Sequence, residues 1–157
     1  MRKFIIYAVV ISVLCLSFPN MAFAENENIA LGKPVTAAGY YSDEFKPHYA
    51  NDGALATMYI GGDNAPAETN ENGEYWLTVD LEGRYIIDSI SLTGRYDMGS
   101  AAYLSGYSIE LSNYEDFSES VRIADHVNLT YKKAYNVSPG LDTGYRYVRV
   151  LNDKQLY

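Results

Sequence analysis

From residue 25 onward, hydrophobic and polar positions alternate over short runs, which is the pattern of β-strands with one face toward a core. In 106–112, Tyr107, Ile109 and Leu111 fall on one face and polar residues on the other. Further strands are expected at 75–81, 85–92 and 147–151, with weaker candidates at 121–124 and 129–137. A tight turn is expected at Glu82-Gly83. Short strands without helical periodicity predict an all-β fold, an antiparallel β-sandwich or jelly roll.

Two long segments, 39–73 and 97–105, do not alternate, and on a sandwich they are expected to form loops at one end that carry binding groups. They combine aromatic rings with hydrogen-bonding side chains, which is what a sugar site needs, because rings stack on C–H faces and polar groups hold hydroxyls. The candidate ligand-binding residues are Tyr41, His48, Tyr59, Arg95, Asp97 and Tyr103.

Several of these residues also have a structural interpretation. His48 is a ligand donor or a histidine that supports its loop, and Arg95 and Asp97 hold a ligand or pair with each other. Trp76 lies in an apolar strand, so packing in the core is expected for it rather than stacking on a sugar. Core or sheet-surface positions are likewise expected for Tyr107 and Tyr145.

The first 24 residues have the order of a secretory signal peptide. Met1-Arg2-Lys3 is basic, 4–18 is apolar, and Ala22-Phe23-Ala24 is a small-x-small cleavage site. A membrane anchor is the alternative, but the apolar run is shorter than the ~20 residues that a spanning helix needs. We therefore expect a secreted or extracellular protein with a single domain at 25–157.

Charge and cysteine content narrow the range of partners. The chain has 12 Lys+Arg against 20 Asp+Glu, a net charge of -8, and 16 tyrosines. This balance argues against binding to nucleic acid or to an anionic membrane surface, both of which need clustered basic residues. The single cysteine, Cys15, lies in the signal segment, so we expect a domain held together by its core without a disulfide.

Six segments in order resemble the coagulation-factor V/VIII type C, or discoidin-like, domain family. They are Asn28–Thr36, Ala50-Asn51-Asp52-Gly53 with Thr57 and Tyr59, Tyr75–Leu81, Ile90–Arg95 followed by Gly106–Ser112, and Tyr145–Val150. The resemblance implies a galactose-binding-domain-like jelly roll. Many secreted bacterial members are similar to family 32 carbohydrate-binding modules for galactose-type sugars, and other members bind fucose, phospholipid or protein.

The resemblance also implies a structural Ca²⁺ ion in the Asp-Gly loop. Asp52 and Thr57 match its side-chain ligands, and Asn51 and Ala54 match its carbonyl ligands. The alternative is that Asp52-Gly53 is simply a tight turn. A fucose site is not expected: Arg95-Tyr96-Asp97 fits that branch, but 98–104 has no basic residue and Glu68 stands where a histidine is usual.

No Gly-x-Ser-x-Gly, P-loop, HExxH or paired-cysteine motif occurs, so we expect a binding module and not an enzyme. The expected partner is a glycan or glycoconjugate, and the alternative is protein binding or cell adhesion through the same loops. The segment 155–157 looks like the approach to a final strand. We therefore expect a chain that lacks its last strand, a module of a longer secreted protein such as a glycoside hydrolase.

Overall fold

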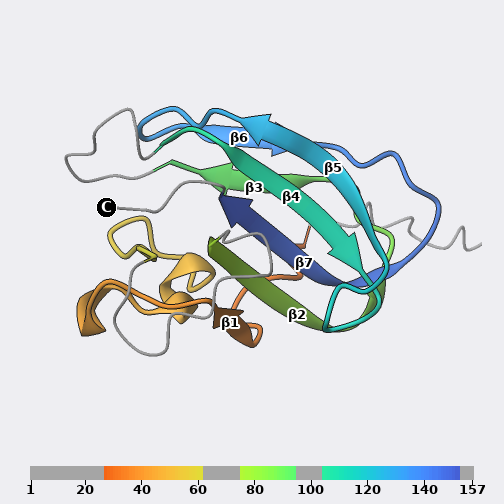
Figure 1. Cartoon of the computed structure of the whole chain (residues 1–157), viewed down its shortest axis with the longest axis horizontal. Coiled ribbons are helices and arrows are strands. Elements are labelled where there is room, and N and C mark those ends of the chain that lie inside the picture. Colours follow the sequence, from red (N-terminus) through yellow and green to blue (C-terminus); the bar gives the residue numbers. More distant parts are fainter. Residues whose placement is uncertain (1–26, 62–74, 95–103, 153–157) are drawn as a thin grey trace, which may run out of the picture.

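The computed structural model of the chain describes residues 27–61, 75–94 and 104–152. Seven strands and two short 3₁₀ helices occur in these ranges (Figure 1). The strands are β1 (Val35–Ala37), β2 (Tyr75–Tyr85), β3 (Ile90–Thr93), β4 (Tyr107–Ser112), β5 (Ser120–Val127), β6 (Ala134–Val137) and β7 (Tyr145–Asn152). The helices are η1 (Asp43–Phe45) and η2 (Pro47–Ala50).

The strands form two antiparallel sheets, which confirms the predicted β-sandwich. The larger sheet has five strands in the order β1-β2-β7-β4-β5, and the smaller pairs β3 with β6. A core cluster is buried between the two layers, and Ile90 of the smaller sheet packs against it. Its members are Leu77, Val79, Leu81, Ile87 and Leu111.

Strand β7 lies between β2 and β4, and this position decides which side chains share a face. Val148 is opposite Val79 on β2 and Leu111 on β4, so all three point into the core. The alternate residues Tyr147, Arg149 and Leu151 point to the outer face of the larger sheet. Tyr147 is only 7% exposed there, because Phe117 in the β4–β5 turn packs against its ring.

Two sequence-based expectations for β2 are wrong. The chain does not turn at Glu82-Gly83: β2 continues to Tyr85, where it pairs again with Tyr145 after a register shift. Glu82 absorbs the irregularity with φ of 61°, and its N–H donates to Asp80 Oδ1 at 2.8 Å. The strand expected at 85–92 therefore begins only at Ile90.

The predicted core position of Trp76 is also wrong. Trp76 alternates with the core residue Leu77, so its half-buried side chain belongs to the outer face. The weak strand candidate at 121–124 is confirmed within β5, whereas the candidate at 129–137 is confirmed only over Ala134–Val137, because a turn bridged between Thr130 and Lys133 precedes β6.

One end of the sandwich, which we call the loop end, collects the segment 39–61 with the start of β2 and the end of β7 (Figure 1). Gly94 after β3 and Leu104 before β4 border the same region, so the described flanks of both non-alternating segments meet there, as predicted. Asn51 fastens the segment to the N-terminal chain, with its Nδ2 donating to the carbonyls of Ala30 at 2.6 Å and Lys33 at 3.0 Å.

Candidate functional site

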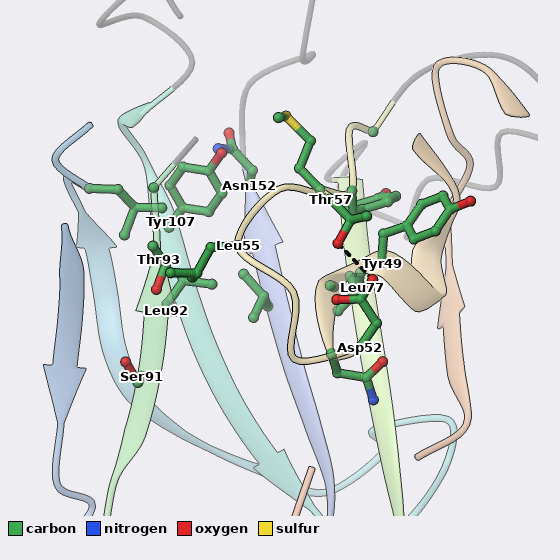
Figure 2. A pocket seen from close by; sticks show the side chains of 18 of the residues that line it. Tyr49, Asp52, Leu55, Thr57, Leu77, Ser91, Leu92, Thr93, Tyr107 and Asn152 are labelled. Atoms are coloured by element: carbon green, nitrogen blue, oxygen red, sulfur yellow. Dashed lines mark hydrogen bonds between the residues drawn. The ribbon is translucent and has the colours of Figure 1, made fainter. Parts of the chain in front are cut away.

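A pocket of about 450 Å³ opens at the loop end (Figure 2). Its walls come from 49–61 and from the ends of β2, β3, β4 and β7. The lining mixes rings, hydroxyls, an amide and a carboxylate with apolar side chains. The residues that matter here are Tyr49, Asp52, Leu55, Thr57, Tyr59, Tyr107 and Asn152. Such a mixture is typical of sites that bind small polar molecules.

Strand register places Tyr107 and Asn152 side by side in this pocket. Tyr107 begins β4 and Asn152 ends β7, and the two residues are direct partners in the sheet. Figure 2 shows the Tyr107 hydroxyl on the side of the Asn152 amide. Asn152 is only 3% exposed, and its Nδ2 donates to the Ser105 carbonyl at 3.2 Å. The pair thus offers a flat ring beside an anchored amide.

The Asp-Gly loop forms the other side of the pocket. Asp52 Oδ1 accepts the Ala54 N–H at 2.8 Å, and Gly53 has φ of 80°, so the predicted tight turn is present. Thr57 Oγ1 lies 2.6 Å from Asp52 Oδ2 and 3.0 Å from the Ala54 carbonyl. The pKa of Asp52 is lowered, first by the Thr57 hydroxyl and then by the Ala54 N–H.

These contacts gather three hard oxygen atoms, from a carboxylate, a hydroxyl and a carbonyl, which is the donor chemistry that Ca²⁺ prefers. The predicted fourth ligand, the Asn51 carbonyl, accepts the Gly32 N–H at 2.8 Å. A carbonyl oxygen has a second lone pair, so this bond leaves it able to bind a cation. No group of three or more His, Cys, Asp or Glu side chains that could hold a metal occurs in the described ranges. A cation here would therefore depend on Asp52 and neutral oxygens.

Tyr59 lines the pocket, but its hydroxyl is already used inside the protein. It donates to the Gly39 carbonyl at 2.8 Å, and the ring packs against the core cluster. Burial raises the pKa of Tyr59 well above its usual value. Its ring is therefore part of the wall, and its hydroxyl is a structural donor.

The other predicted ligand residues divide into two groups. Tyr41 and His48 do not line the pocket. Tyr41 is 57% exposed with its ring near Phe45, and the ring of the exposed His48 contacts that of Tyr49 at a tilt, with 4.2 Å between centroids. Arg95, Asp97 and Tyr103 lie outside the described residues. All four predicted calcium ligands do line the pocket.

Among the lining residues that were not predicted from the sequence are Tyr49, Leu55, Tyr107 and Asn152. The sequence pattern could have indicated Tyr107, because it begins a strand directly after a segment predicted to be a loop. Asn152 likewise stands at the end of a predicted strand. Tyr49 follows His48 in a 3₁₀ helix, where neighbouring side chains point in different directions, so only the structure shows which one faces the pocket.

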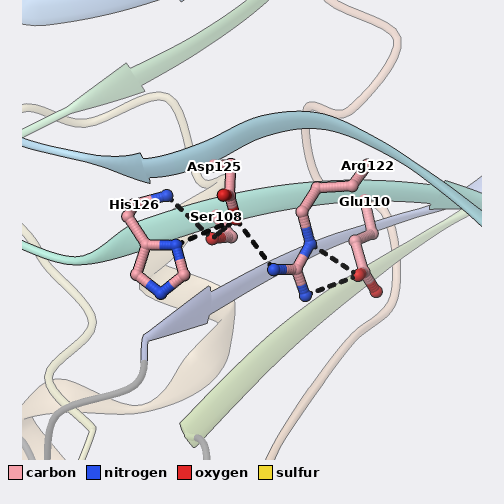
Figure 3. A network of polar contacts seen from close by, with 5 residues as sticks. All are labelled: Ser108, Glu110, Arg122, Asp125 and His126. Atoms are coloured by element: carbon pink, nitrogen blue, oxygen red, sulfur yellow. Dashed lines mark hydrogen bonds and ion pairs between the residues drawn. The ribbon is translucent and has the colours of Figure 1, made fainter.

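A separate polar network lies across β4 and β5 (Figure 3). Asp125 Oδ1 accepts from Arg122 at 2.8 Å and from Ser108 at 3.3 Å, and it lies 2.9 Å from His126 Nδ1. Arg122 also reaches Glu110 at 2.9 Å. The hydroxyl of Ser108 donates to the Asp125 carboxylate and accepts the backbone N–H of His126, while the His126 ring nitrogen Nδ1 faces Asp125, so the imidazole is not placed to take the proton of Ser108. The group fastens two strands together.

The family described as F5/8 type C domain matches residues 34–155. No match is found among curated proteins. No helix in the described ranges is long and apolar enough to cross a membrane.

Several solved structures share the fold. A chitosan-binding module of a chitosanase/glucanase from Paenibacillus sp. IK-5 is 21% identical, with a TM-score of 0.61, over 80% of this chain and 86% of that one. CpGH89CBM32-4 of Clostridium perfringens, in complex with GlcNAc-α-1,4-galactose, is 19% identical, with a TM-score of 0.63 and coverages of 89% and 88%. A fucolectin from striped bass, Morone saxatilis, is 23% identical, with a TM-score of 0.68 and coverages of 82% and 44%.

Proposed function

The chain belongs to the F5/8 type C domain family, and we propose that it is a non-catalytic, lectin-like module that binds a glycan in the loop-end pocket. The observation that carries the proposal is the lining of this pocket, where Tyr107 and the anchored amide of Asn152 face the Asp52–Thr57 loop across about 450 Å³. Glycans bound to structures of the same fold agree with this assignment.

The division of roles follows from chemistry. The Tyr107 ring supplies a flat surface for the C–H face of a sugar, and Leu55, which is 63% exposed, supplies an apolar contact beside it. The loop oxygens of Asp52 and Thr57 supply hydrogen bonds that replace those of a sugar hydroxyl to water. Because each replacement contributes only about 1 kcal/mol net, we expect a Kd on the order of 0.1–1 mM.

A glycan array followed by calorimetry with the sugars that it retains tests the proposal. Leu55→Arg fills the pocket with a long side chain without removing core packing, and we expect it to abolish detectable binding. Ile86→Arg is the matched control, because Ile86 is 62% exposed and follows the opposite end of β2. Both variants should keep the wild-type melting temperature.

A second pair tests the ring itself. Tyr107→Ala should weaken binding about tenfold, since aromatic contacts typically contribute one to a few kcal/mol. Tyr114→Ala removes a half-exposed tyrosine just beyond the other end of β4 and should change nothing. No retention by any glycan, together with binding to cells or matrix proteins, would replace the lectin proposal with adhesion.

We also propose that the Asp52 loop holds Ca²⁺ through Asp52 and Thr57, with the carbonyls of Asn51 and Ala54. The ion would stiffen the wall of the pocket. With one carboxylate in the set, a weak site with a Kd of about 0.1–1 mM is expected. Millimolar CaCl₂ should raise the melting temperature of the wild type and of Asp43→Asn, an exposed acid of the same segment. An equal rise in Asp52→Asn would reject the site.

Secretion is part of the same proposal. A module for cell-surface or polysaccharide glycans acts outside the cell, in agreement with the signal-like segment at 1–24. Amino-terminal sequencing of the protein recovered from the medium should begin at Glu25. Because a single weak site retains poorly, we expect it to act together with further binding modules or domains of a longer chain.

A further inference from the structure

A second groove, of about 400 Å³, lies on the outer face of the five-stranded sheet. We call it the sheet groove. Its floor and walls come from β1, β2, β7 and the turn after β4. The lining residues are Pro34, Thr36, Trp76, Thr78, Asp80, Glu115, Tyr147 and Arg149. Only Trp76 also borders the loop-end pocket. This volume falls within the usual range for small-molecule sites, about 300–1,000 Å³.

The guanidinium of Arg149 is the central feature of the sheet groove. Its Cζ lies 3.7 Å from the ring centroid of Phe117 and 4.9 Å from that of Trp76. Its Nε donates to Thr78 Oγ1 at 2.8 Å, and Nη2 donates to the Glu115 carbonyl at 3.3 Å. The rings and these two bonds fix the plane of the guanidinium and leave N–H donors along its edge.

Arg149 differs from two neighbouring arginines in its partners. Arg122 pairs with Glu110 at 2.9 Å, and Arg146 pairs with Asp80 at 2.8 Å through two parallel hydrogen bonds. Among the described residues, no carboxylate lies within ion-pair distance of Arg149, whose partners are a hydroxyl and a carbonyl. A partly buried charge with only neutral partners is a strong attractor for an anion.

The nearby acids do not neutralise this charge directly. Burial lowers the pKa of Arg149, and the more distant carboxylates of Glu110 and Asp116 only partly oppose that effect. Glu110 is already held by Arg122, and Asp116 accepts the Ser118 N–H. The positive potential at the edge of the guanidinium is therefore available to a ligand.

We propose that the sheet groove is a second glycan site, which binds an acidic sugar chain by pairing the carboxylate of a uronic acid with Arg149. The half-buried Trp76 provides apolar surface for a sugar ring, and Thr36 and the carboxylates of Asp80 and Glu115 provide partners for hydroxyls. The guanidinium fork matches the geometry of a carboxylate, which a neutral sugar lacks.

A peptide fits this groove less well than a glycan. An extended peptide usually gains affinity by adding a strand to an exposed sheet edge. The floor of the sheet groove belongs to β2 and β7, each of which is already paired with a strand on both sides. It therefore presents side chains and no free row of backbone donors and acceptors.

The test compares a tetrasaccharide of galacturonic acid with its fully methyl-esterified form, which keeps the sugar and removes the charge. Trp76 is the only tryptophan of the chain and borders both pockets, so its fluorescence detects binding, calorimetry gives the affinity, and the variants below assign the binding to one pocket. We expect the acid to bind about tenfold or more tightly than the ester, the usual effect of one charge-assisted hydrogen bond. Raising NaCl from about 0.05 M to about 0.5 M should reduce the difference, because salt screens the pair.

Two sets of variants locate the interaction. Arg149→Gln should abolish the preference for the acid. Because Arg149 packs between rings, that variant can also destabilise the fold, so exposed Thr36 gives an independent reading. It occupies the same row of the sheet as Thr78 and Arg149. Thr36→Glu should weaken binding of the acid about threefold, Thr36→Lys should not weaken it, and neither should change the melting temperature.

Leu55→Arg, which blocks the loop-end pocket, should leave binding of the galacturonate unchanged. The proposal for the sheet groove and the proposal for the loop-end pocket are therefore tested independently. Equal affinity for acid and ester, equal affinity in both Thr36 variants, or loss of binding in Leu55→Arg would each overturn the proposal. Equally tight binding of a tetraglutamate peptide would overturn the assignment to a glycan.

Discussion

Tyr59→Phe separates the structural role of Tyr59 from a role in ligand binding. The substitution removes one hydroxyl and keeps the ring that packs on the core cluster, so it creates no cavity of consequence. The lost hydrogen bond runs from Tyr59 to the Gly39 carbonyl at 2.8 Å. It joins two parts of the loop-end segment that are 20 residues apart in sequence.

The size of the effect follows from the environment of that bond. A neutral hydrogen bond contributes about 1 kcal/mol net, and a buried carbonyl left without its donor adds a penalty of about 1–3 kcal/mol. Gly39 is buried, so part of that penalty applies. We expect the free energy of unfolding to fall by about 1–2 kcal/mol. For a domain of this size, the melting temperature should fall by about 2–8 °C.

The dependence on pH has a defined sign. Burial raises the pKa of Tyr59 in the folded state, whereas a tyrosine of the unfolded chain ionises near its usual value of about 10. Above about pH 10 the unfolded state therefore loses a proton that the folded state keeps, and this contribution to stability declines as the pH rises. Phenylalanine does not ionise, so the difference in the free energy of unfolding between the wild type and Tyr59→Phe should become smaller above about pH 10.

The assay is urea unfolding of both proteins at pH 7 and at alkaline pH, with calorimetry for a glycan retained on the array. We expect lower stability and unchanged affinity in Tyr59→Phe. Unchanged stability would mean that the hydroxyl is not bonded as described. Reduced affinity at unchanged stability would place Tyr59 in the binding site.

Two further predictions concern residues that support the sites. Gly94→Ala should lower the free energy of unfolding by about 1–3 kcal/mol in urea unfolding, because the added Cβ would overlap the Thr130 carbonyl, which belongs to a backbone turn and not to a flexible side chain. Asp80→Asn should make the free energy of unfolding less dependent on pH in acid. Arg146 lowers the pKa of Asp80 in the folded state, so the ionised carboxylate stabilises the fold above the unfolded pKa of about 3.9. This contribution is lost as the pH falls through the folded pKa. Acid unfolding followed by circular dichroism tests the Asp80→Asn prediction, and the same acid transition in the wild type and the variant would contradict it.

The sequence predicted a strand best where one face of that strand is buried and the other face is exposed to solvent. The run around Ile109 and Leu111 alternates because β4 packs one face against the core, and both residues are fully buried. Prediction failed at Glu82-Gly83, where Glu-Gly is typical of a turn, because β2 passes through an irregularity there and pairs with β7 again at Tyr85. It failed at Trp76 because an aromatic residue in an apolar strand does not reveal which face is the core.

The candidate site was predictable in outline. Alternation stopped at the segments that flank the loop end. The four residues proposed as calcium ligands around Asp52 are local in sequence, so they line the same pocket in the structure. The individual ligand residues were harder to predict, because residues such as His48 and Tyr49 are adjacent in sequence but face different surroundings.

By itself the sequence determined the fold class, the family and the end of the sandwich that carries the loops, because these depend on local periodicity and on the order of short motifs. The tertiary structure alone decided which distant residues become neighbours. Tyr107 meets Asn152, and Arg149 meets Trp76 and Phe117, because β7 inserts between β2 and β4. Those contacts depend on strand order and register, which pair residues far apart in the chain and leave no local pattern in it.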